Sequence, residues 1–212
     1  EITSDPWEHL IIKDFLPQSL YNGVVKETEG YTKNKKLKKP NIRAYHIYVN
    51  KSVSVYPSTP FLKEYYDILL DDLIVESLKK KLSLKQELCD LYSELNMFTK
   101  GYVYDEIHPD RCDKAITMLH YLADEGDDES LGTFLYTPYK HGKNLDVFND
   151  RVASSPYVGN CVLFFVPQDT KNPFYRTNHC MANKSDTTFL RKSFQTFWLK
   201  EKADWTKDPQ KG

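Results

Sequence analysis

The sequence predicts a mainly β protein of the α+β kind, with helices packed on one sheet. Short stretches in which apolar and polar residues alternate recur along most of the chain, as strands that bury one face require. One longer stretch, residues 59–92, instead repeats apolar residues every three or four positions, which is typical of a helix that buries one side. The 15 Tyr and 11 Phe residues supply large side chains for the core of a β-sandwich.

The N-terminal part predicts a strand, a helix and a second strand. Residues 6–16 alternate and are closed by Pro17, which predicts a strand and a turn. Ser19 can cap a helix that runs to about Gly30. Residues 42–49 alternate again, so that Arg43 is expected to share one face with the other odd-numbered residues.

The helical stretch has a start signal in Pro60, a residue that fits the first turn of a helix. Three lysines at 79–81 and Ser83 predict a break, followed by a second helix through Leu91. We expect these helices to cover one face of a sheet.

The second half of the chain predicts a series of strands separated by polar turns. Acidic residues 123–130 predict a solvated hairpin turn, and polar residues 139–151 predict a mobile surface loop near the mouth of the fold. The tail, residues 203–212, is expected to be frayed. The expected strands are residues 94–101, 114–122, 131–138, 160–166, 174–181 and 188–199.

Composition limits the classes of function. The 212 residues predict a single domain, 1–212, and the net charge of −1 gives no general attraction to nucleic acid or to an anionic membrane. The basic run within residues 33–39 is the only local exception. The four cysteines show no CxxC spacing, which predicts reduced thiols and a cytoplasmic location. No stretch approaches the roughly 20 apolar residues that a membrane span needs.

His108 and Asp110 stand at the centre of the most informative stretch, residues 102–122. On an extended segment, side chains two positions apart point to the same face. One imidazole and one carboxylate then lie side by side, as two of the three ligands of a facial 2-His-1-carboxylate iron site. The third ligand must be a His from elsewhere in the chain. His179 is the best candidate, and His141 is its rival.

Arg191 and Ser193 follow His179 on the last expected strand and share one face of it. A guanidinium suits a carboxylate in bidentate geometry, and a neighbouring hydroxyl can donate a second hydrogen bond. The aromatic surroundings of Arg191 in the sequence predict a buried cation that needs an anionic partner. An ordinary edge salt bridge is the alternative.

The order of these features resembles the double-stranded β-helix oxygenases that use Fe(II) and 2-oxoglutarate, and within them the prolyl 4-hydroxylase-like group. His-x-Asp, a strand ending in Tyr-Leu, Gly-Thr, an apolar strand, His and Arg-x-Ser follow one another. The resemblance implies a jelly-roll core with His108, Asp110 and His179 as catalytic iron ligands. It also implies 2-oxoglutarate and O2 as cosubstrates, with ascorbate as a further cofactor.

The same resemblance implies which residues bind 2-oxoglutarate. Tyr121 closes its strand where the group has a Tyr whose hydroxyl touches the distal carboxylate. Phe98 through Tyr104 is similar to the group's Tyr-x-x-Gly-x-x-Tyr, but Phe98 lacks the first hydroxyl. Asn96 matches an Asn-x-aromatic pattern of other branches. The cosubstrate-binding residues implied in this way are Arg191, Ser193, Tyr121, Asn96 and Tyr104.

The function expected from these features is hydroxylation of a peptidyl, prolyl-like or small-molecule C–H bond, with release of succinate and CO2. Three alternatives stay open. One is a non-catalytic jelly-roll binding module, and a second is a nucleic-acid demethylase of the same superfamily, which only the basic run supports. The third is a zinc hydrolase with the same three ligands. Only the oxygenase requires Arg191 as a cation inside the fold.

Overall fold

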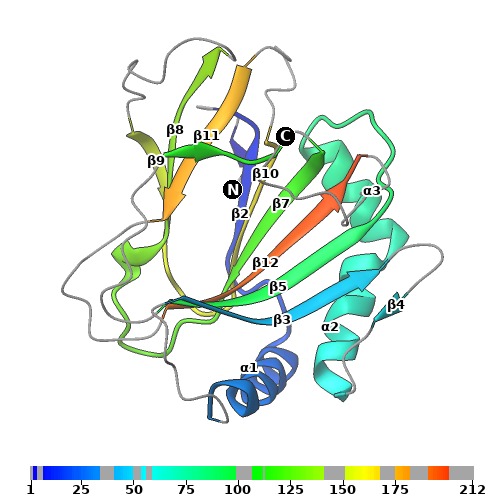
Figure 1. The fold of residues 1–212 in the computed structure, drawn as a ribbon, viewed down its shortest axis with the longest axis vertical. Coiled ribbons are helices and arrows are strands. Elements are labelled where there is room, and N and C mark those ends of the chain that lie inside the picture. Colours follow the sequence, from blue (N-terminus) through cyan, green and yellow to red (C-terminus); the bar gives the residue numbers. More distant parts are fainter. Residues whose placement is uncertain are drawn as a thin grey trace.

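Two antiparallel sheets and three helices make up the described part of this computed structural model (Figure 1). The structure describes residues 2–3, 7–33, 41–49, 54–55, 59–98, 107–111, 113–140, 151–167, 175–181 and 191–200. Expectations for Tyr104, His141, the basic residues 34–39 and the tail 203–212 lie outside these residues, as does most of the polar loop 139–151.

The larger sheet, sheet A, has eight strands and the smaller, sheet B, has four. Sheet A runs in the order β1 (Ile2–Thr3), β2 (His9–Ile12), β10 (Cys161–Phe165), β7 (Lys114–Tyr121), β12 (Arg191–Leu199), β5 (Leu91–Phe98), β3 (Asn41–Val49) and β4 (Ser54–Val55). Sheet B runs in the order β6 (His108–Pro109), β11 (Tyr175–Met181), β8 (Thr133–Lys140) and β9 (Arg151–Ser155).

The chain passes repeatedly between the two sheets from β6 onward. β6 lies in sheet B, β7 in sheet A, β8 and β9 in sheet B, β10 in A, β11 in B and β12 in A. Several neighbouring strands, such as β10 and β7 or β7 and β12 in sheet A and β6 and β11 in sheet B, are therefore far apart in sequence, as in a jelly roll. This winding brings the expected site residues, which are spread over half the chain, into the space between the sheets.

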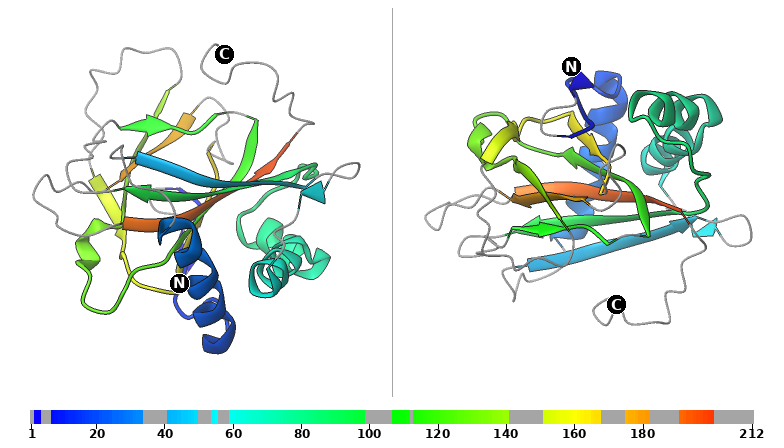
Figure 2. Two further views of the ribbon diagram at one scale, coloured as in Figure 1. Left: turned by 60° about the horizontal axis from the view of Figure 1, so that its bottom comes forward. Right: turned by 90° about the horizontal axis from the view of Figure 1, so that it is seen from above.

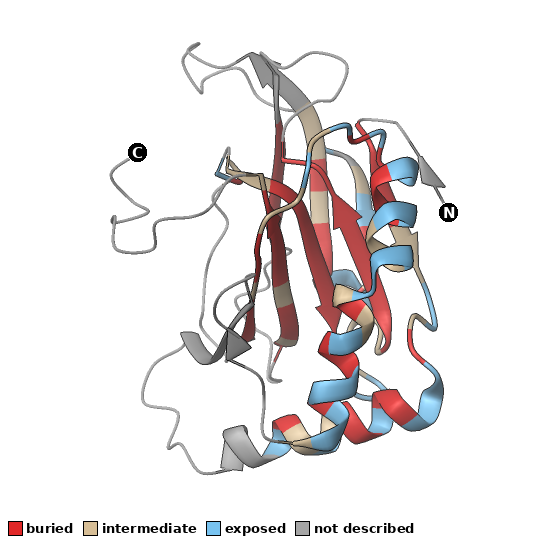
Figure 3. Cartoon of the chain, turned by 90° about the vertical axis from the view of Figure 1, so that its right-hand side faces the viewer, coloured by how far each residue is buried: buried red, intermediate tan, exposed pale blue. Residues whose placement is uncertain are grey.

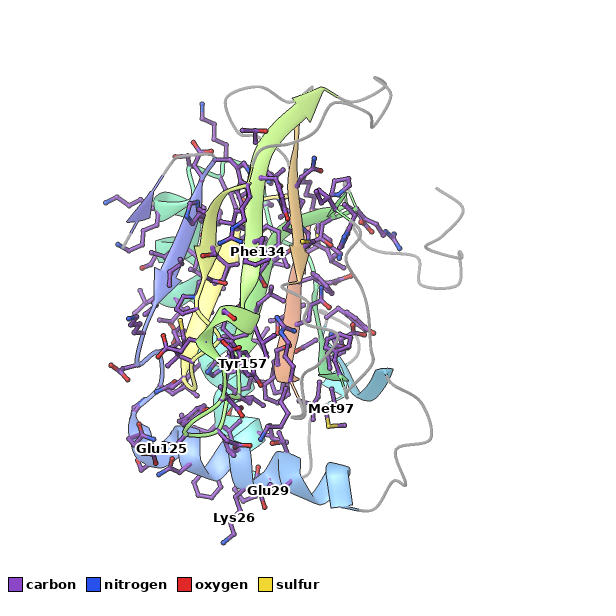
Figure 4. All side chains as sticks on the ribbon, turned by 90° about the vertical axis from the view of Figure 1, so that its left-hand side faces the viewer. Lys26, Glu29, Met97, Glu125, Phe134 and Tyr157 are labelled. Atoms are coloured by element: carbon purple, nitrogen blue, oxygen red, sulfur yellow. The ribbon has the colours of Figure 1, made fainter. Side chains whose placement is uncertain are left out.

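Helices α1 (Gln18–Lys33), α2 (Pro60–Leu70) and α3 (Asp72–Lys81) cover the outer face of sheet A (Figures 1 and 3). Tyr65 and Leu69 of α2 pack in one core cluster with Met118 of β7 and Phe194 of β12. The opposite sides of the helices are exposed, and Figure 4 shows Lys26 and Glu29 pointing away from the sheet. The predicted helix cover of one sheet is confirmed.

Figure 2 shows sheet B on the side of sheet A opposite the helices. A second core cluster of side chains fills the space between the two sheets. Strand alternation decides which residues enter it. On β7, Leu119 and Tyr121 belong to this inner cluster, whereas Met118 belongs to the helix side. The inner face of β12 carries Arg191 and Ser193, which the structure buries at 7% and 1% exposure.

The helical stretch breaks earlier than the sequence predicts. Asp71 separates α2 from α3, and its carboxylate accepts hydrogen bonds from the backbone N–H groups of Leu73 (2.9 Å) and Ile74 (3.3 Å). A carboxylate in that position caps a new helix. The expected second helix through Leu91 is wrong, since Ser83 has a φ of 55° and residues 83–90 are not helical. Leu91 instead begins β5.

Two further expectations are corrected by the pairing of strands. The acidic residues 123–130 do not form a hairpin turn, because they lead through the short 3-10 helix η1 (Glu129–Leu131) from sheet A to sheet B. The register of β3 shifts between Arg43 and Tyr45, so its alternation is not continuous. Strand β9 was not expected, because residues 151–155 show no alternation of apolar and polar residues.

No helix within the described ranges is long and apolar enough to cross a membrane.

Candidate metal and cosubstrate site

His108 and His179 lie directly opposite each other in sheet B. The short strand β6 pairs with β11 so that these two residues are Cα partners. Their ring centroids are 4.6 Å apart, and the ring of Phe165 packs 4.7 Å from that of His179. The predicted pairing of His108 with a distant His is therefore present, and the register of the sheet produces it.

Asp110 follows β6 and is buried at 5% exposure, with hydrogen bonds to both carboxylate oxygens. The Lys114 ammonium donates to Oδ1, and the Thr117 hydroxyl donates to Oδ2 over 2.6 Å. Burial by itself would raise the pKa of Asp110. The charge of Lys114, the charge that His179 acquires only at low pH, and the two hydrogen bonds outweigh it and hold the pKa well below its usual value. Asp110 is thus a carboxylate at neutral pH.

His179 is kept neutral. Burial lowers the pKa of this imidazole to about 3, and the nearby Asp110 opposes the shift only in part. Its Nδ1 atom is buried and has no hydrogen-bond partner in the part of the chain that the structure describes. A neutral imidazole with a free nitrogen can donate an electron pair to a metal ion.

The donor set fits Fe(II). Two imidazoles and one carboxylate are the ligands of the facial triad. The Nδ1 atom of His179 makes no hydrogen bond to the described residues, so its electron pair is available to a metal ion. Within the described ranges, however, no three His, Cys, Asp or Glu side chains are already arranged to hold a metal ion. Lys114 occupies one oxygen of Asp110, so the side chains must rearrange for all three to bind.

Arg191 is buried between the sheets among aromatic rings. Its guanidinium carbon lies 5.4 Å from the ring centroid of Tyr121, 5.6 Å from that of Tyr157 and 5.8 Å from that of Phe98. Its Nε donates to the Leu131 carbonyl over 2.8 Å. No carboxylate within the described residues forms an ion pair with it. A buried guanidinium normally has an anionic partner, so this cation is suited to an anionic ligand.

Ser193, Tyr121 and Asn96 stand side by side on three adjacent strands. Ser193 of β12 is the Cα partner of Tyr121 on β7 and of Asn96 on β5. The Tyr121 hydroxyl contacts the hydroxyls of Thr133 (2.8 Å) and Ser155 (2.6 Å), which joins sheet A to sheet B. The structure therefore brings together the described residues that were expected to bind the cosubstrate.

Asn96 also takes part in a polar network with residues of β5 and β12 on the inner face of sheet A. Its Nδ2 donates to Glu94 over 3.2 Å and to Gln195 over 2.8 Å, while its Oδ1 is buried without a partner among the described residues. The amide oxygen is thus left to accept from a ligand. Tyr104, the remaining expected contact, lies outside the described residues.

A cavity of about 290 Å³ opens beside the candidate metal ligands. His108, Asp110 and Lys114 form one side, and the parallel rings of Tyr92 and Phe197, with centroids 6.1 Å apart, form another. The carboxylates of Glu94 and Asp113 also line the cavity. It therefore combines an aromatic wall with charged groups.

Arg191 and Asp110 both contact the inner face of β7 in sheet A, while His108 and His179 belong to sheet B. Thr117, which contacts Asp110, and Tyr121, which borders Arg191, are four residues apart on β7, or roughly 13 Å along the strand. Tyr157, which is labelled in Figure 4, also borders Arg191. Its backbone N–H donates to the carbonyl of Glu129, so it lies beside η1.

Sequence reasoning missed the residues that support the site. Lys114 and Thr117 hold Asp110, and Thr133 and Ser155 hold the Tyr121 hydroxyl. Only Thr117 carried a usable signal, since strand alternation places it on the same face as Tyr121. Lys114 begins β7 at a register shift against β12, where alternation does not predict its face, and Thr133 and Ser155 come from the other sheet, which no local pattern connects.

Comparison with known proteins gives matches among solved structures alone: no family model and no curated protein matches this sequence. A prolyl-4-hydroxylase of Pseudomonas putida aligns with a TM-score of 0.59 and 15% identity, over 91% of this chain and 92% of its own. The dioxygenase for auxin oxidation 1 of Arabidopsis thaliana, solved with 2-oxoglutarate, aligns with a TM-score of 0.59 and 13% identity, over 93% and 85%.

A third structure is the epimerase SnoN of nogalamycin biosynthesis, in complex with Fe3+ and α-ketoglutarate. It aligns with a TM-score of 0.51 and 13% identity, over 90% of this chain and 78% of its own. At these identities the similarity concerns the fold. The chain thus has the fold of the 2-oxoglutarate and Fe(II) oxygenases, a double-stranded β-helix core with helices on one sheet, as its sequence predicts.

Proposed function

We propose that this protein is a non-haem Fe(II)- and 2-oxoglutarate-dependent dioxygenase that hydroxylates a C–H bond. The observation that carries the proposal is the buried Arg191. It lies between the sheets, on the inner face of sheet A, while the paired His108 and His179 belong to sheet B, and it has no carboxylate partner among the described residues. A metal hydrolase or a simple binding module gives no reason to bury a cation there.

Each residue has a defined task in this proposal. His108, Asp110 and His179 hold the metal, and Thr117 orients the Asp110 carboxylate through its second oxygen. Bound Fe(II) supplies the oxidation together with O2 and 2-oxoglutarate, and succinate and CO2 are released. Arg191 and Ser193 bind the distal carboxylate of 2-oxoglutarate, with Tyr121 and Asn96 beside them. The inner apolar cluster excludes water from this region.

The proposed substrate is a peptidyl, prolyl-like side chain or a small molecule. The cavity beside His108 and Asp110 has about the volume of a small ligand site, and its aromatic wall suits a flat or ring-shaped apolar group. The solved structures of the same fold include a prolyl-4-hydroxylase and a dioxygenase for auxin oxidation. Succinate release with candidate substrates, with and without ascorbate, distinguishes these classes and tests ascorbate as a cofactor.

We also propose a reducing, cytoplasmic location. Among the cysteines that the structure describes, Cys89, Cys161 and Cys180 form no disulfide, which agrees with this location.

Thermal unfolding under anaerobic conditions tests the cosubstrate site, with Mn(II) in place of iron. A ligand at 100 times its dissociation constant adds about 2.7 kcal/mol to the free energy of unfolding. For a chain of this size we expect 2-oxoglutarate to raise the Tm by roughly 5–11 °C when the metal is present. Asp110→Asn should abolish the metal effect and with it the effect of 2-oxoglutarate.

Arg191→Met is the variant that distinguishes binding of the metal from binding of 2-oxoglutarate. It should still respond to Mn(II) but lose the further rise with 2-oxoglutarate, whereas Arg191→Lys should keep part of it because a cation remains. If saturating Mn(II) and 2-oxoglutarate leave the Tm of the wild type unchanged, the oxygenase proposal fails. A non-catalytic binding module is then the better explanation.

A further inference from the structure

Lys114 places a cation on one of the proposed metal ligands. Its ammonium donates to Oδ1 of Asp110 and lies 3.5 Å from the ring centroid of Phe197. The Lys114 side chain is 14% exposed and that of Asp110 is 5% exposed, so this ion pair is largely shielded from water. The contact holds the ammonium between the proposed metal site and the aromatic wall of the cavity.

We propose that Lys114 is a positioning residue whose ammonium competes with the divalent metal for Oδ1 of Asp110 and swings into the cavity when the metal binds. This inference rests on the proposed iron site. Thr117 keeps its hydrogen bond to Oδ2 in both states, so the carboxylate stays oriented while the cation at Oδ1 is exchanged.

Electrostatics make the exchange necessary. Two cations at one carboxylate oxygen repel each other strongly in a buried environment, where the effective dielectric constant is low. A lysine ammonium is also a poor substitute for a metal ion, because it has no vacant orbital to accept the electron pair of a ligand and offers no open position for one. The ammonium therefore has to leave Oδ1 before Asp110 can bind the metal.

The cavity can receive the displaced ammonium. It is about 290 Å³ in volume and borders Lys114 directly. Glu94 and Asp113 line the same cavity, where Glu94 accepts from Tyr92 and Asn96 and Asp113 pairs with Arg111. The negative charge of Glu94 attracts the ammonium. The flexible four-carbon stem of Lys114 allows the head group to move while the backbone stays in β7. Lys114 then becomes part of the wall that meets the substrate.

Competition predicts that removing the ammonium tightens metal binding. In the wild type, the metal must break the Lys114–Asp110 pair, whereas in Lys114→Met the Lys114 ammonium no longer competes for Oδ1. We expect the dissociation constant for Mn(II) to fall at least about tenfold, which corresponds to about 1.4 kcal/mol. An electron paramagnetic resonance titration of free Mn(II) against the full chain, without 2-oxoglutarate, measures this constant.

Two matched variants control for general disturbance of the site. Lys114→Arg keeps a competing cation and should bind Mn(II) about as tightly as the wild type. Thr117→Val removes the other hydrogen bond to Asp110 and no cation, so it should not bind the metal more tightly. Equal or weaker binding by a folded Lys114→Met variant, as judged by circular dichroism, would overturn the inference.

Chemical labelling of the wild type tests the movement itself and needs no variant. Acetic anhydride should modify Lys114 slowly without metal and faster with saturating Mn(II), as read by mass spectrometry. Lys63, whose side chain is 59% exposed, should react equally in both states and serves as the internal control. Bound Mn(II) with unchanged labelling of Lys114 would refute the displacement. If the wild type and all variants bind no Mn(II), the proposed iron site itself fails.

Discussion

His120 lies on the helix side of β7, with its ring against those of Phe15, Tyr21 and Tyr65. Burial lowers the pKa of this imidazole to about 3. Burial also raises the pKa of Tyr65, whose hydroxyl oxygen lies 3.2 Å from Nδ1 of His120, and raises that of Tyr21 to about 12. All three groups are therefore neutral at pH 7, and His120 belongs to the core.

The buried His120 makes stability depend on pH. Above pH 6.5 the imidazole is neutral in both states and has no effect. Between pH 6.5 and about 3 only the unfolded chain takes up the proton, so stability falls by about 1.4 kcal/mol per pH unit. We expect the free energy of unfolding of His120→Phe to depend less steeply on pH in this range. The difference from the wild type should correspond to about one proton, or about 1.4 kcal/mol per pH unit. Urea titrations without metal measure the slope, and Tyr65→Phe, which keeps the imidazole, should retain it.

At the scale of elements, Asp71 decides where one helical stretch becomes two helices. It is the last residue before α3, and its side chain satisfies two backbone N–H groups that the new helix leaves without partners. The sequence shows the apolar repeat on both sides of Asp71, so periodicity gives no sign of the break. The cap is a contact between a side chain and the backbone, which only the three-dimensional structure shows.

Asp71→Ala should therefore destabilise the protein by about 1 kcal/mol, the usual loss for a capping carboxylate. For a chain of this size the Tm should fall by roughly 2–4 °C. The neighbouring variant Asp72→Ala is the control, because Asp72 lies in the first turn of α3 and is not the capping residue. A loss from Asp72→Ala equal to that from Asp71→Ala would show that charge near the helix terminus, and not the cap, is responsible. Differential scanning calorimetry measures both.

At the scale of the whole molecule, the backbone is tightly packed where the chain passes from sheet A into sheet B. Gly132 lies between η1 and β8, and a Cβ atom there would be 1.7 Å from the carbonyl oxygen of Ser155 at the end of β9. Neither backbone can move away easily, since β8 and β9 pair with each other. The pairing of β8 with β9 therefore requires a residue without a side chain at position 132.

Gly132→Ala should lower the free energy of unfolding by at least about 3 kcal/mol, a loss typical of substitutions that overpack a rigid part of the core. Gly126 is the matched control: its φ of 88° disfavours a side chain, but no atom lies within 4 Å of the added Cβ. Gly126→Ala should therefore cost only about 1–2 kcal/mol of backbone strain. Chemical denaturation compares the two, and a smaller loss at Gly132 than at Gly126 would contradict the close approach.

Local pattern was enough to place most of the strands. Continuous apolar runs located β7 and β10 to within a few residues, as in strands buried on both faces, and alternation located β12, because one face of a strand repeats with a period of two. The same rule correctly placed Arg191 and Ser193 on one face. It failed at the β3 register shift, at β9 and at the Asp71 cap, where pairing or capping replaces the simple repeat.

The sequence by itself determined the fold class and the identity of the chemical groups: two imidazoles, one carboxylate and one buried guanidinium, each in a recognisable strand context. Only the tertiary structure decided how these groups meet. The register between β6 and β11 sets His108 against His179, and the path of the chain brings Lys114 and Thr117 onto Asp110. The reason is physical: strand periodicity is a local property, whereas register and contacts between sheets depend on the packing of the whole chain.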